Sequence, residues 1–311
     1  VSMRKLFVCI ALGLTTLTGN AASPLWMRDV QISPDGTEIA FCYKGDIYKV
    51  SAGGGTAIQL TTQPSYECTP IWSPDSKQIA FASDRNGNFD IFVMPATGGT
   101  AQRLTTHSSS ELPSAFTPDG KYILFSASIQ DPSQSALFPT TAMTELYKVP
   151  VNGGRTEQVL GTPAEAVCYA PSGEFFLYQD RKGFEDEWRK HHTSSITRDI
   201  WLYDTKTGKH TNLTNHAGED RNPVLSPDGK SVYLLSERKG SFNVYSFPLD
   251  NAQDLKAVTS FKTHPVRFLS MSHGGTLCYA YDGEIYTQKD NATPQKINID
   301  IVRDDQDKIA D

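Results

Sequence analysis

The stretch of the sequence with the most chemically capable side chains lies between residues 182 and 198. Adjacent histidines could bind zinc, neighbouring carboxylates could carry out general acid–base chemistry, and Trp and Arg are enriched at the energetic centres of protein interfaces. The side chains concerned are Lys182, Glu185, Asp186, Trp188, Arg189, His191, His192 and Arg198. A metal site, a catalytic pair and a binding surface are therefore the three candidates.

The histidines and carboxylates of this stretch fit a binding surface better than a reactive centre. His191 and His192 would point to opposite faces of a strand, and no Cys or His lies nearby at ligand spacing. The run from residue 185 to 190 mixes acids with bases, as self-neutralising ion-pair networks do. We therefore predict a partner- or peptide-binding rim at these residues, without a metal.

Signatures of catalysis are missing elsewhere. No Gly-x-Ser-x-Gly elbow occurs, and nothing in the spacing of the Ser, His and Asp residues nominates a triad. We predict no catalytic residue and no cofactor in this chain.

A tetrapeptide that recurs along the chain organises these residues. Pro presets the first corner of a turn, Asp accepts local backbone hydrogen bonds, and Gly takes the left-handed conformation that follows. Successive copies begin 40 to 56 residues apart, which is typical of four-stranded propeller blades. The copies are Ser33-Pro34-Asp35-Gly36, Ser73-Pro74-Asp75-Ser76, Thr117-Pro118-Asp119-Gly120, Ala170-Pro171-Ser172-Gly173, Ser226-Pro227-Asp228-Gly229 and the degenerate Ser272-His273-Gly274-Gly275.

Short apolar segments surround each copy and predict β-strands. In the second unit, strands are expected at 69–72 and 78–82, a third begins at Asp90, and a fourth spans 102–105. Helical periodicity is absent. The pattern predicts an all-β fold, a six-bladed β-propeller of four-stranded antiparallel blades, and a sandwich is the alternative. Because all units begin with the same strand, we expect closure by packing the first blade on the last, without strand exchange.

Two loops break the repeat. The connection from the second to the third strand spans 4 to 9 positions in four units, but 20 in the third and 21 in the fourth. Loops of this type emerge at one end of the ring, so both insertions should share a rim. The third-unit insertion, 129–139, is rich in Pro and Ser, and it is either packed through Leu137 and Phe138 or a mobile excursion.

Acid–base corners recur at one position of the repeat. They follow the second strand of three units, at Asp84-Arg85, Asp180-Arg181 and Glu237-Arg238. Repetition favours an inter-blade salt bridge or a turn lock over contact with a substrate.

The N-terminal segment resembles a secretory signal. Arg4 and Lys5 precede a short apolar run and small residues at 19–23, so we assign 1–22 to a signal peptide cleaved near Ala21 or Ala22. A buried helix is the alternative. The protein would then be exported, to the periplasm or the medium. Disulfides are possible there, but the remaining cysteines are interpreted as buried free thiols: Cys42, Cys68, Cys168 and Cys278.

Composition excludes several classes of protein. With 38% hydrophobic and 21% charged residues, the chain is too apolar for disorder and too polar for a multi-span membrane protein. A net charge of −6 argues against a broad nucleic-acid-binding surface. We predict no nucleic-acid partner.

The Ser-Pro-Asp-Gly, Ile-Ala-Phe and Asp-Ile-Tyr segments resemble the propeller repeats of TolB and of tricorn-type serine peptidases. The stretch from 180 to 204 looks like the tricorn family in particular, and the resemblance covers about 23–305. It implies a domain division into the signal peptide, a propeller at 23–302, and at 303–311 the start of a linker to further domains.

Tricorn-type peptidases combine two propellers with catalytic regions and a PDZ domain, and this chain resembles the first propeller. The resemblance implies a non-catalytic module that docks on the catalytic and PDZ domains and guides short peptides to or from them. It places the catalytic residues beyond residue 311. An arginine pair that anchors peptides in the family has no match in 129–139, and Arg189 and Lys190 are the substitute we consider.

Two other functions stay open at this point. A free-standing, TolB-like scaffold in the periplasm would bind a protein partner, and a self-contained hydrolase would cleave peptides unaided. Homo-oligomerisation is also left open.

Overall fold

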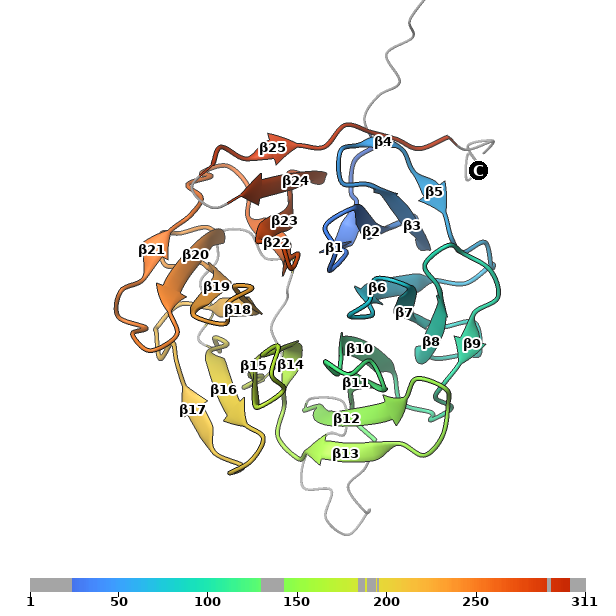
Figure 1. Cartoon of the computed structure of the whole chain (residues 1–311), viewed down its shortest axis with the longest axis horizontal. Coiled ribbons are helices and arrows are strands. Elements are labelled where there is room, and N and C mark those ends of the chain that lie inside the picture. Colours follow the sequence, from blue (N-terminus) through green and yellow to red (C-terminus); the bar gives the residue numbers. More distant parts are fainter. Residues whose placement is uncertain are drawn as a thin grey trace, which may run out of the picture.

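The computed structural model describes residues 24–129, 143–183, 188, 194, 196–289 and 292–302, which form a ring of six blades (Figure 1). Each blade is a sheet of four antiparallel strands that follow one another in sequence order, and only in blade one does a further short strand lie between the third and the fourth. The described part of the chain contains no helix. The predicted six-bladed propeller is confirmed, whereas the assigned signal peptide and linker lie outside the described residues.

The innermost strand comes first in each blade. Blade one holds β1 (Arg28–Ile32), β2 (Glu38–Tyr43), β3 (Asp46–Ser51) and β5 (Ile58–Gln59). Blade two holds β6 (Glu67–Trp72), β7 (Gln78–Ser83), β8 (Asp90–Pro95) and β9 (Gln102–Arg103). Blade three holds β10 (Glu111–Phe116), β11 (Tyr122–Ala127), β12 (Glu145–Pro150) and β13 (Glu157–Leu160).

The remaining blades repeat the arrangement. Blade four holds β14 (Glu165–Tyr169), β15 (Phe175–Gln179), β16 (Ile200–Asp204) and β17 (His210–Asn212). Blade five holds β18 (Asp220–Leu225), β19 (Ser231–Ser236), β20 (Asn243–Pro248) and β21 (Lys256–Ala257). Blade six holds β22 (Val266–Met271), β23 (Thr276–Tyr281), β24 (Glu284–Lys289) and β25 (Gln295–Lys296).

Local hydrogen bonds explain the recurring turn. In blade one, Ser33 Oγ donates to Asp35 Oδ1 at 2.6 Å and accepts from the Glu38 amide at 3.0 Å, while the Thr37 amide donates to Asp35. Gly36 has a φ of 76°, which favours glycine. The same Ser or Thr to Asp bond forms at Ser73, Thr117 and Ser226. The turn therefore connects the first two strands through its own side chains.

A second repeated bond ties the fourth strand to the third. The amide of Ile47, which follows the acid at the start of β3, donates to Thr61 Oγ1 at 2.8 Å. Thr105, Thr214 and Thr259 accept the equivalent amide in blades two, four and five. This bond explains why a threonine recurs after the short outer strand in these four blades.

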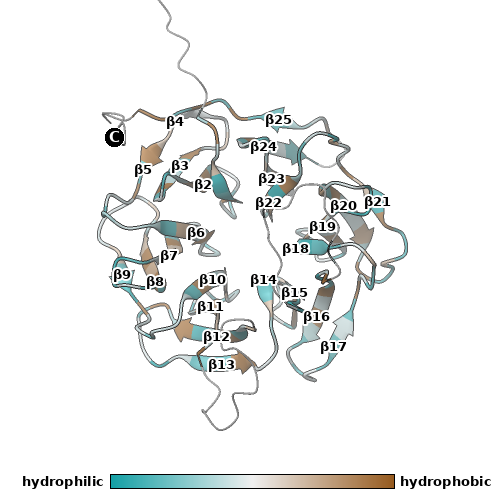
Figure 2. Cartoon of the chain, turned by 180° about the vertical axis from the view of Figure 1, so that it is seen from behind, coloured by the Kyte–Doolittle hydropathy of each residue, from teal (hydrophilic) through white to brown (hydrophobic). Residues whose placement is uncertain are grey.

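Apolar side chains fill the space between blades. Phe41, Phe81, Phe125 and Tyr178 occupy equivalent positions of the second strands and are buried. The first three stack on an aromatic ring of the third strand, with centroids 5.8 to 5.9 Å apart. Strands such as β7 and β8 are accordingly hydrophobic, whereas the outer β17 and β25 are hydrophilic (Figure 2).

The four described cysteines are free, as predicted, but Cys68 and Cys168 are only half-buried. Cys42 and Cys278 are buried, and burial raises the pKa of both thiols. Burial also raises the pKa of Cys68 to about 12 and that of Cys168 to about 11. All four therefore remain protonated at neutral pH.

Closure follows the prediction and adds one contact to it. Blades one and six share an apolar cluster that includes Met27, Ile39, Cys278 and Ile285, and among the described strands no blade borrows one from another. In addition, β26 (Ile299–Asp300) pairs in parallel with β4 (Gly55–Thr56) at the outer edge of blade one. This short pair, which the sequence did not predict, ties the C-terminal end of the described chain to blade one (Figure 1).

Every innermost strand carries a β-bulge. The register shifts at the same place in β1, β6, β10, β14, β18 and β22. Four positions before each turn, five blades place a non-glycine residue with left-handed φ, and blade three places Pro113. The five residues are Asp29, Thr69, Ala166, Asn222 and Phe268. Such backbone strain is typical of functional sites.

The neighbouring blade satisfies amides that the bulges leave unpaired. Thr69 donates to Asp29 Oδ2 at 3.1 Å, Val167 to Ser114 Oγ at 2.7 Å, and Asn222 to Gln179 Oε1 at 2.9 Å. Each bond joins one blade to the preceding one, so the bulges also hold the ring together.

Two buried carboxylates meet between blades two and three. Asp90 forms an ion pair with Arg103 at 2.7 Å, and Glu111 lies beside them with one oxygen that has no hydrogen-bond partner among the described residues. Burial raises the pKa of Asp90 and raises that of Glu111 to about 7. The positive charge of Arg103 thus has to balance the carboxyl groups of both Asp90 and Glu111.

A substitution at Gly54 can test the contribution of the contact between β4 and β26 to stability. Its φ is 92°, and an added Cβ would lie 2.6 Å from the Asn298 carbonyl oxygen. Gly99 has a φ of 122°, and an added Cβ there meets nothing within 4 Å. Both Gly→Ala changes strain the backbone, but only the change at Gly54 also creates a steric clash. Gly54→Ala should therefore lower the free energy of unfolding by about 1–3 kcal/mol more than Gly99→Ala. Equal losses in denaturant titration would show that the closing pair adds no stability.

Ala166 tests the strain of the bulges. Its φ is 49°, whereas Ala115, also in an innermost strand, does not have positive φ. Ala166→Gly should raise the free energy of unfolding by up to about 1 kcal/mol, because glycine removes the left-handed penalty. Ala115→Gly should lower it by about 0.5–1 kcal/mol. A loss of stability in both variants would rule out strain at the bulge.

Glu111 should make stability depend on pH. The folded state keeps a proton on Glu111 up to about pH 7, whereas an unfolded glutamate releases it near pH 4.5. The free energy of unfolding contributed by this group therefore falls as the pH rises through that window. Glu111→Gln should remove this fall and be more stable than the parent at pH 8 by up to about 3 kcal/mol. Parallel stability curves for the two proteins between pH 4.5 and 8 would contradict this assignment.

Candidate functional site

The structure describes three of the eight residues assigned to the binding rim. They are Lys182, Trp188 and Arg198. Glu185, Asp186, Arg189, His191 and His192 lie outside the described residues, as do Lys190 and the blade-three segment 130–142 with Leu137 and Phe138. The predicted rim as a whole therefore stays a prediction.

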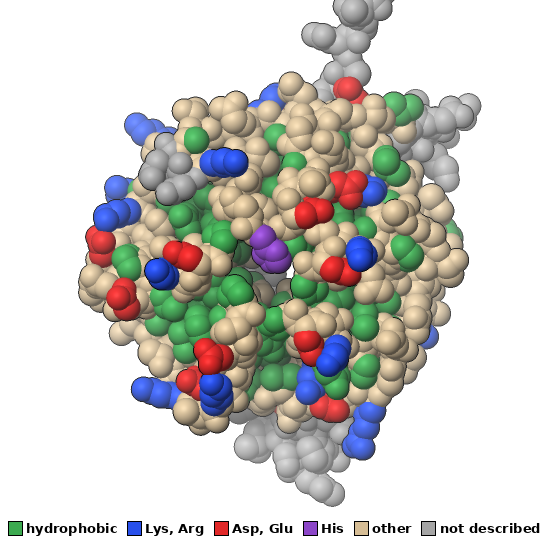
Figure 3. Space-filling view, in the orientation of Figure 1, with side chains coloured by type: hydrophobic (Ala, Val, Ile, Leu, Met, Phe, Trp, Pro, Cys, Tyr) green, Lys and Arg blue, Asp and Glu red, His purple; other side chains and the backbone are tan. Residues whose placement is uncertain are grey.

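A cavity of about 690 Å³ lies at the centre of the ring and is lined by the innermost strands of all six blades. The strained residues Asp29, Thr69, Ala166, Asn222 and Phe268 belong to its wall. Ser128, Thr144, Gln179 and Arg198, which flank the two long insertions, also line it. Both insertions thus arise beside this central cavity. The ring is also visibly hollowed at its centre in the space-filling view (Figure 3).

Arginines on one side of the central cavity are held by two glutamates. Arg198 is only 5% exposed, and its Nη1 donates to Glu219 Oε1 at 2.8 Å. Arg221 Nε lies 2.7 Å from the same oxygen, and Arg181 Nη1 donates to Glu165 Oε1 at 3.0 Å. With Arg267, four arginines and one glutamate, Glu165, line this side of the cavity, so positive charge predominates here.

Arg181 belongs to one of the predicted acid–base corners. It links the end of the second strand to Glu165 on the first strand of its own blade. Arg85 reaches Glu67 at 3.1 Å and Arg238 reaches Asp220 at 2.9 Å in the same way. The corners are thus locks within a blade, and not salt bridges between blades. Of the three arginines, Arg181 alone also lines the central cavity.

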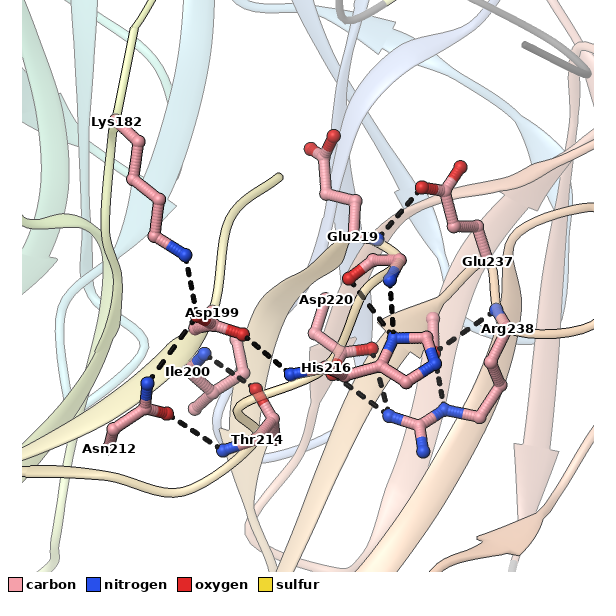
Figure 4. Close-up of polar contacts among 12 residues, drawn as sticks. Lys182, Asp199, Ile200, Asn212, Thr214, His216, Glu219, Asp220, Glu237 and Arg238 are labelled. Carbon is pink, nitrogen blue, oxygen red and sulfur yellow. Dashed lines mark hydrogen bonds and ion pairs between the residues drawn. The ribbon is translucent and has the colours of Figure 1, made fainter. Parts of the chain in front are cut away.

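Lys182 lies in a polar network between blades four and five (Figure 4). Its ammonium is 2.5 Å from Asp199 Oδ2 and 3.6 Å from Asp180 Oδ2. Burial opposes the charge, but the bond to Asp199 raises the pKa of Lys182 overall. Asp199 also accepts the His216 amide, so this lysine and its partner fix the base of the blade-four insertion.

Trp188 lies far across the ring from its own blade. The Arg28 guanidinium is 4.6 Å and that of Arg267 is 5.1 Å from the centroid of its ring. Phe268 meets the indole edge to face at 6.1 Å, and Arg267 Nη2 donates to the Trp188 carbonyl at 3.1 Å. Trp188 is therefore in contact with blades one and six at the cavity wall.

The blade-three side of the central cavity is neutral and rich in hydroxyls. Ser109 Oγ donates to the Ser128 carbonyl at 2.6 Å, and Ser126 Oγ donates to the Ala164 carbonyl at 3.0 Å. Leu112 stands beside them and is 41% exposed. The cavity therefore offers hydrogen bonds and apolar contact on one side and positive charge on the other, which is the chemistry of binding.

In the part of the chain that the structure describes, no group of three or more His, Cys, Asp or Glu side chains is placed to hold a metal ion. Over the same residues, no helix is long and apolar enough to cross a membrane.

Reasoning from the sequence missed most of the cavity wall. Glu165, Arg221 and Arg267 share one position, five residues before the turn of their blades. Aligning the repeats at that position would have found them, because it lines the cavity in blades three to six. The predicted residues Trp188 and Arg198 do lie in this wall.

Comparison with known proteins agrees with the geometry. The sequence profile described as the Tricorn protease N-terminal beta propeller domain matches residues 24–294. A crystal structure of the tricorn protease superposes with a TM-score of 0.76 at 22% identity, over 91% of this chain and 27% of that one. TolB from Acinetobacter baumannii gives 0.61 at 20% identity, over 84% of this chain and 60% of that one.

One curated relative is also a peptidase by name. The uncharacterized peptidase YuxL of Bacillus subtilis (strain 168) is 32% identical over 72 residues, which is 23% of this chain and 10% of that protein. The chain thus covers only a small part of that relative and about a quarter of the tricorn protease. The match of the profile over residues 24–294 nevertheless covers most of the chain. This chain belongs to the tricorn protease N-terminal β-propeller family.

Proposed function

We propose that this propeller is a non-catalytic module of an exported, tricorn-like serine peptidase, and that it guides short peptides to or from the catalytic domains. The observation that carries the proposal is the central cavity. Its volume of about 690 Å³ lies in the range of ligand sites, which is about 300–1,000 Å³. Its hydroxyl wall suits a peptide backbone, and its arginine wall suits carboxylates.

The size of the chain relative to its relatives supports a modular role. It corresponds to about a quarter of the tricorn protease, so further domains would supply the reaction. Under this proposal, the rim at residues 182–198 docks on the catalytic and PDZ domains of the same polypeptide. Trp188 is 47% exposed and so remains accessible to a partner in part.

A free-standing, TolB-like scaffold that binds a protein partner in the periplasm is the second candidate. The superposition on TolB, which covers 84% of this chain, favours it. The source gene distinguishes the two functions. A reading frame that continues into a second propeller, a PDZ domain and a serine peptidase region supports the first, and a stop codon directly after residue 311 supports the second.

Arg181 provides a test of peptide binding with a matched control. Arg181→Gln and Arg238→Gln each remove the same lock within a blade, but only Arg181 lines the cavity. Because a charge-assisted hydrogen bond contributes about 1.5–3 kcal/mol, Arg181→Gln should weaken the binding of short peptides with free carboxylates at least about tenfold. Arg238→Gln should bind like the parent.

The dissociation constants can be measured by fluorescence anisotropy on a panel of labelled peptides. Thermal unfolding of both variants shows whether each lock contributes the same stability. Equal affinities of the two variants, or a parent chain that binds no peptide of the panel, would rule out a peptide site in the central cavity.

A further inference from the structure

The site around Trp188 is assembled from three parts of the chain. Arg28 comes from β1, Arg267 and Phe268 come from β22, and the indole comes from the insertion of blade four. The first two are equivalent residues of neighbouring blades, five positions before the turn. Two cations and one aromatic ring therefore meet the indole where blades one and six join.

Phe268 is held there against a local preference of the backbone. Its φ is 59°, which is unusual for a bulky side chain. The bulge that causes this strain also brings Phe268 to the wall of the central cavity, edge to face with Trp188. Strained residues persist where the surrounding structure fixes them, and they gather at ligand sites.

A second hollow adjoins the same residues. A pocket of about 470 Å³ lies between blades one and six, and Trp188, Arg267 and Phe268 belong to its wall and to that of the central cavity. Trp26, which is 70% exposed and has a φ of 71°, lines the far side of this lateral pocket. Trp188 thus stands between the two hollows.

The contacts of Trp188 are strong enough to position it and weak enough to be replaced. Its side chain stays 47% exposed, and a cation–π contact at an exposed site changes an equilibrium constant by about two- to fivefold. Two such contacts alone favour the bound indole by about four- to twenty-fivefold, and the hydrogen bond from Arg267 to the main chain adds to this. A second aromatic side chain could compete for the same place at ordinary ligand concentrations.

We propose that Arg28, Arg267 and Phe268 form a clamp for an aromatic side chain of the guided peptide, and that Trp188 occupies this clamp in the free protein. The inference rests on the proposed function in that the ligand is a peptide. Trp188 acts as an internal competitor, so a peptide must displace it to reach the clamp. The blade-four insertion thereby selects peptides that carry a Trp, Tyr or Phe residue.

The clamp can be tested without a peptide. The probe is N-acetyl-L-tryptophanamide, and N-acetyl-L-leucinamide is the aliphatic control. Trp188→Ala should bind the aromatic probe about tenfold more tightly than the parent, because the competitor is gone. The variant Trp188→Ala with Arg267→Gln should lose most of this gain, and neither protein should prefer the leucine probe. Trp26→Ala removes another exposed indole from the lateral pocket and should not raise the affinity.

Isothermal titration calorimetry measures these affinities, and thermal unfolding checks the fold of each variant. A measurement on the parent chain covers the case in which Trp188→Ala does not fold. With 5-fluorotryptophan incorporated, the fluorine resonance of Trp188 should shift as the aromatic probe is added, while that of Trp72 should stay in place.

Equal affinity of the parent and Trp188→Ala for the aromatic probe, or a Trp188 resonance that does not respond to it, overturns the clamp. These outcomes leave the peptide test at Arg181 untouched, because the variants compared there all retain Trp188. Failure of the clamp and failure of the proposed function are thus separate results.

Discussion

The bulge in each innermost strand is the constraint on which the site depends. A regular strand would alternate its side chains between the two faces of the blade, and few would reach the ring axis. The extra residue, left-handed in five blades, breaks this alternation where the strand passes the cavity. Glu165, Arg221 and Arg267 stand directly before it and line the cavity. Backbone strain thus determines which side chains surround the cavity.

The fold was predictable because its repeated contacts are local in the sequence. The turn bonds of Ser33 and Asp35 join residues within five positions, and Thr61 lies 14 positions from the amide that it accepts. Local contacts of this kind require similar residue types in each copy of the repeat, and this recurrence is visible in the sequence. The parallel pair of β26 and β4 occurs once and contains two residues per strand, so no sequence pattern predicts it.

The cavity wall was hard to predict for the opposite reason. The position five residues before the turn holds Arg28, Cys68, Leu112, Glu165, Arg221 and Arg267, and a position that differs in each copy leaves no repeat to detect. Arg181 was recognised as a lock because it recurs as Arg85 and Arg238. Its second place, in the cavity wall, leaves no repeat in the sequence, because Arg85 and Arg238 do not line the cavity.

The ring repeats its backbone sixfold but not its chemistry. Hydroxyls from blade three face arginines from blades four, five and six, so the central cavity has a neutral side and a cationic side. The whole chain carries a net charge of −6, and positive charge is therefore concentrated where a ligand would enter. A symmetric ring would bind an extended ligand in several equivalent directions. Opposed walls allow one direction, because only one end of the ligand can meet the arginines.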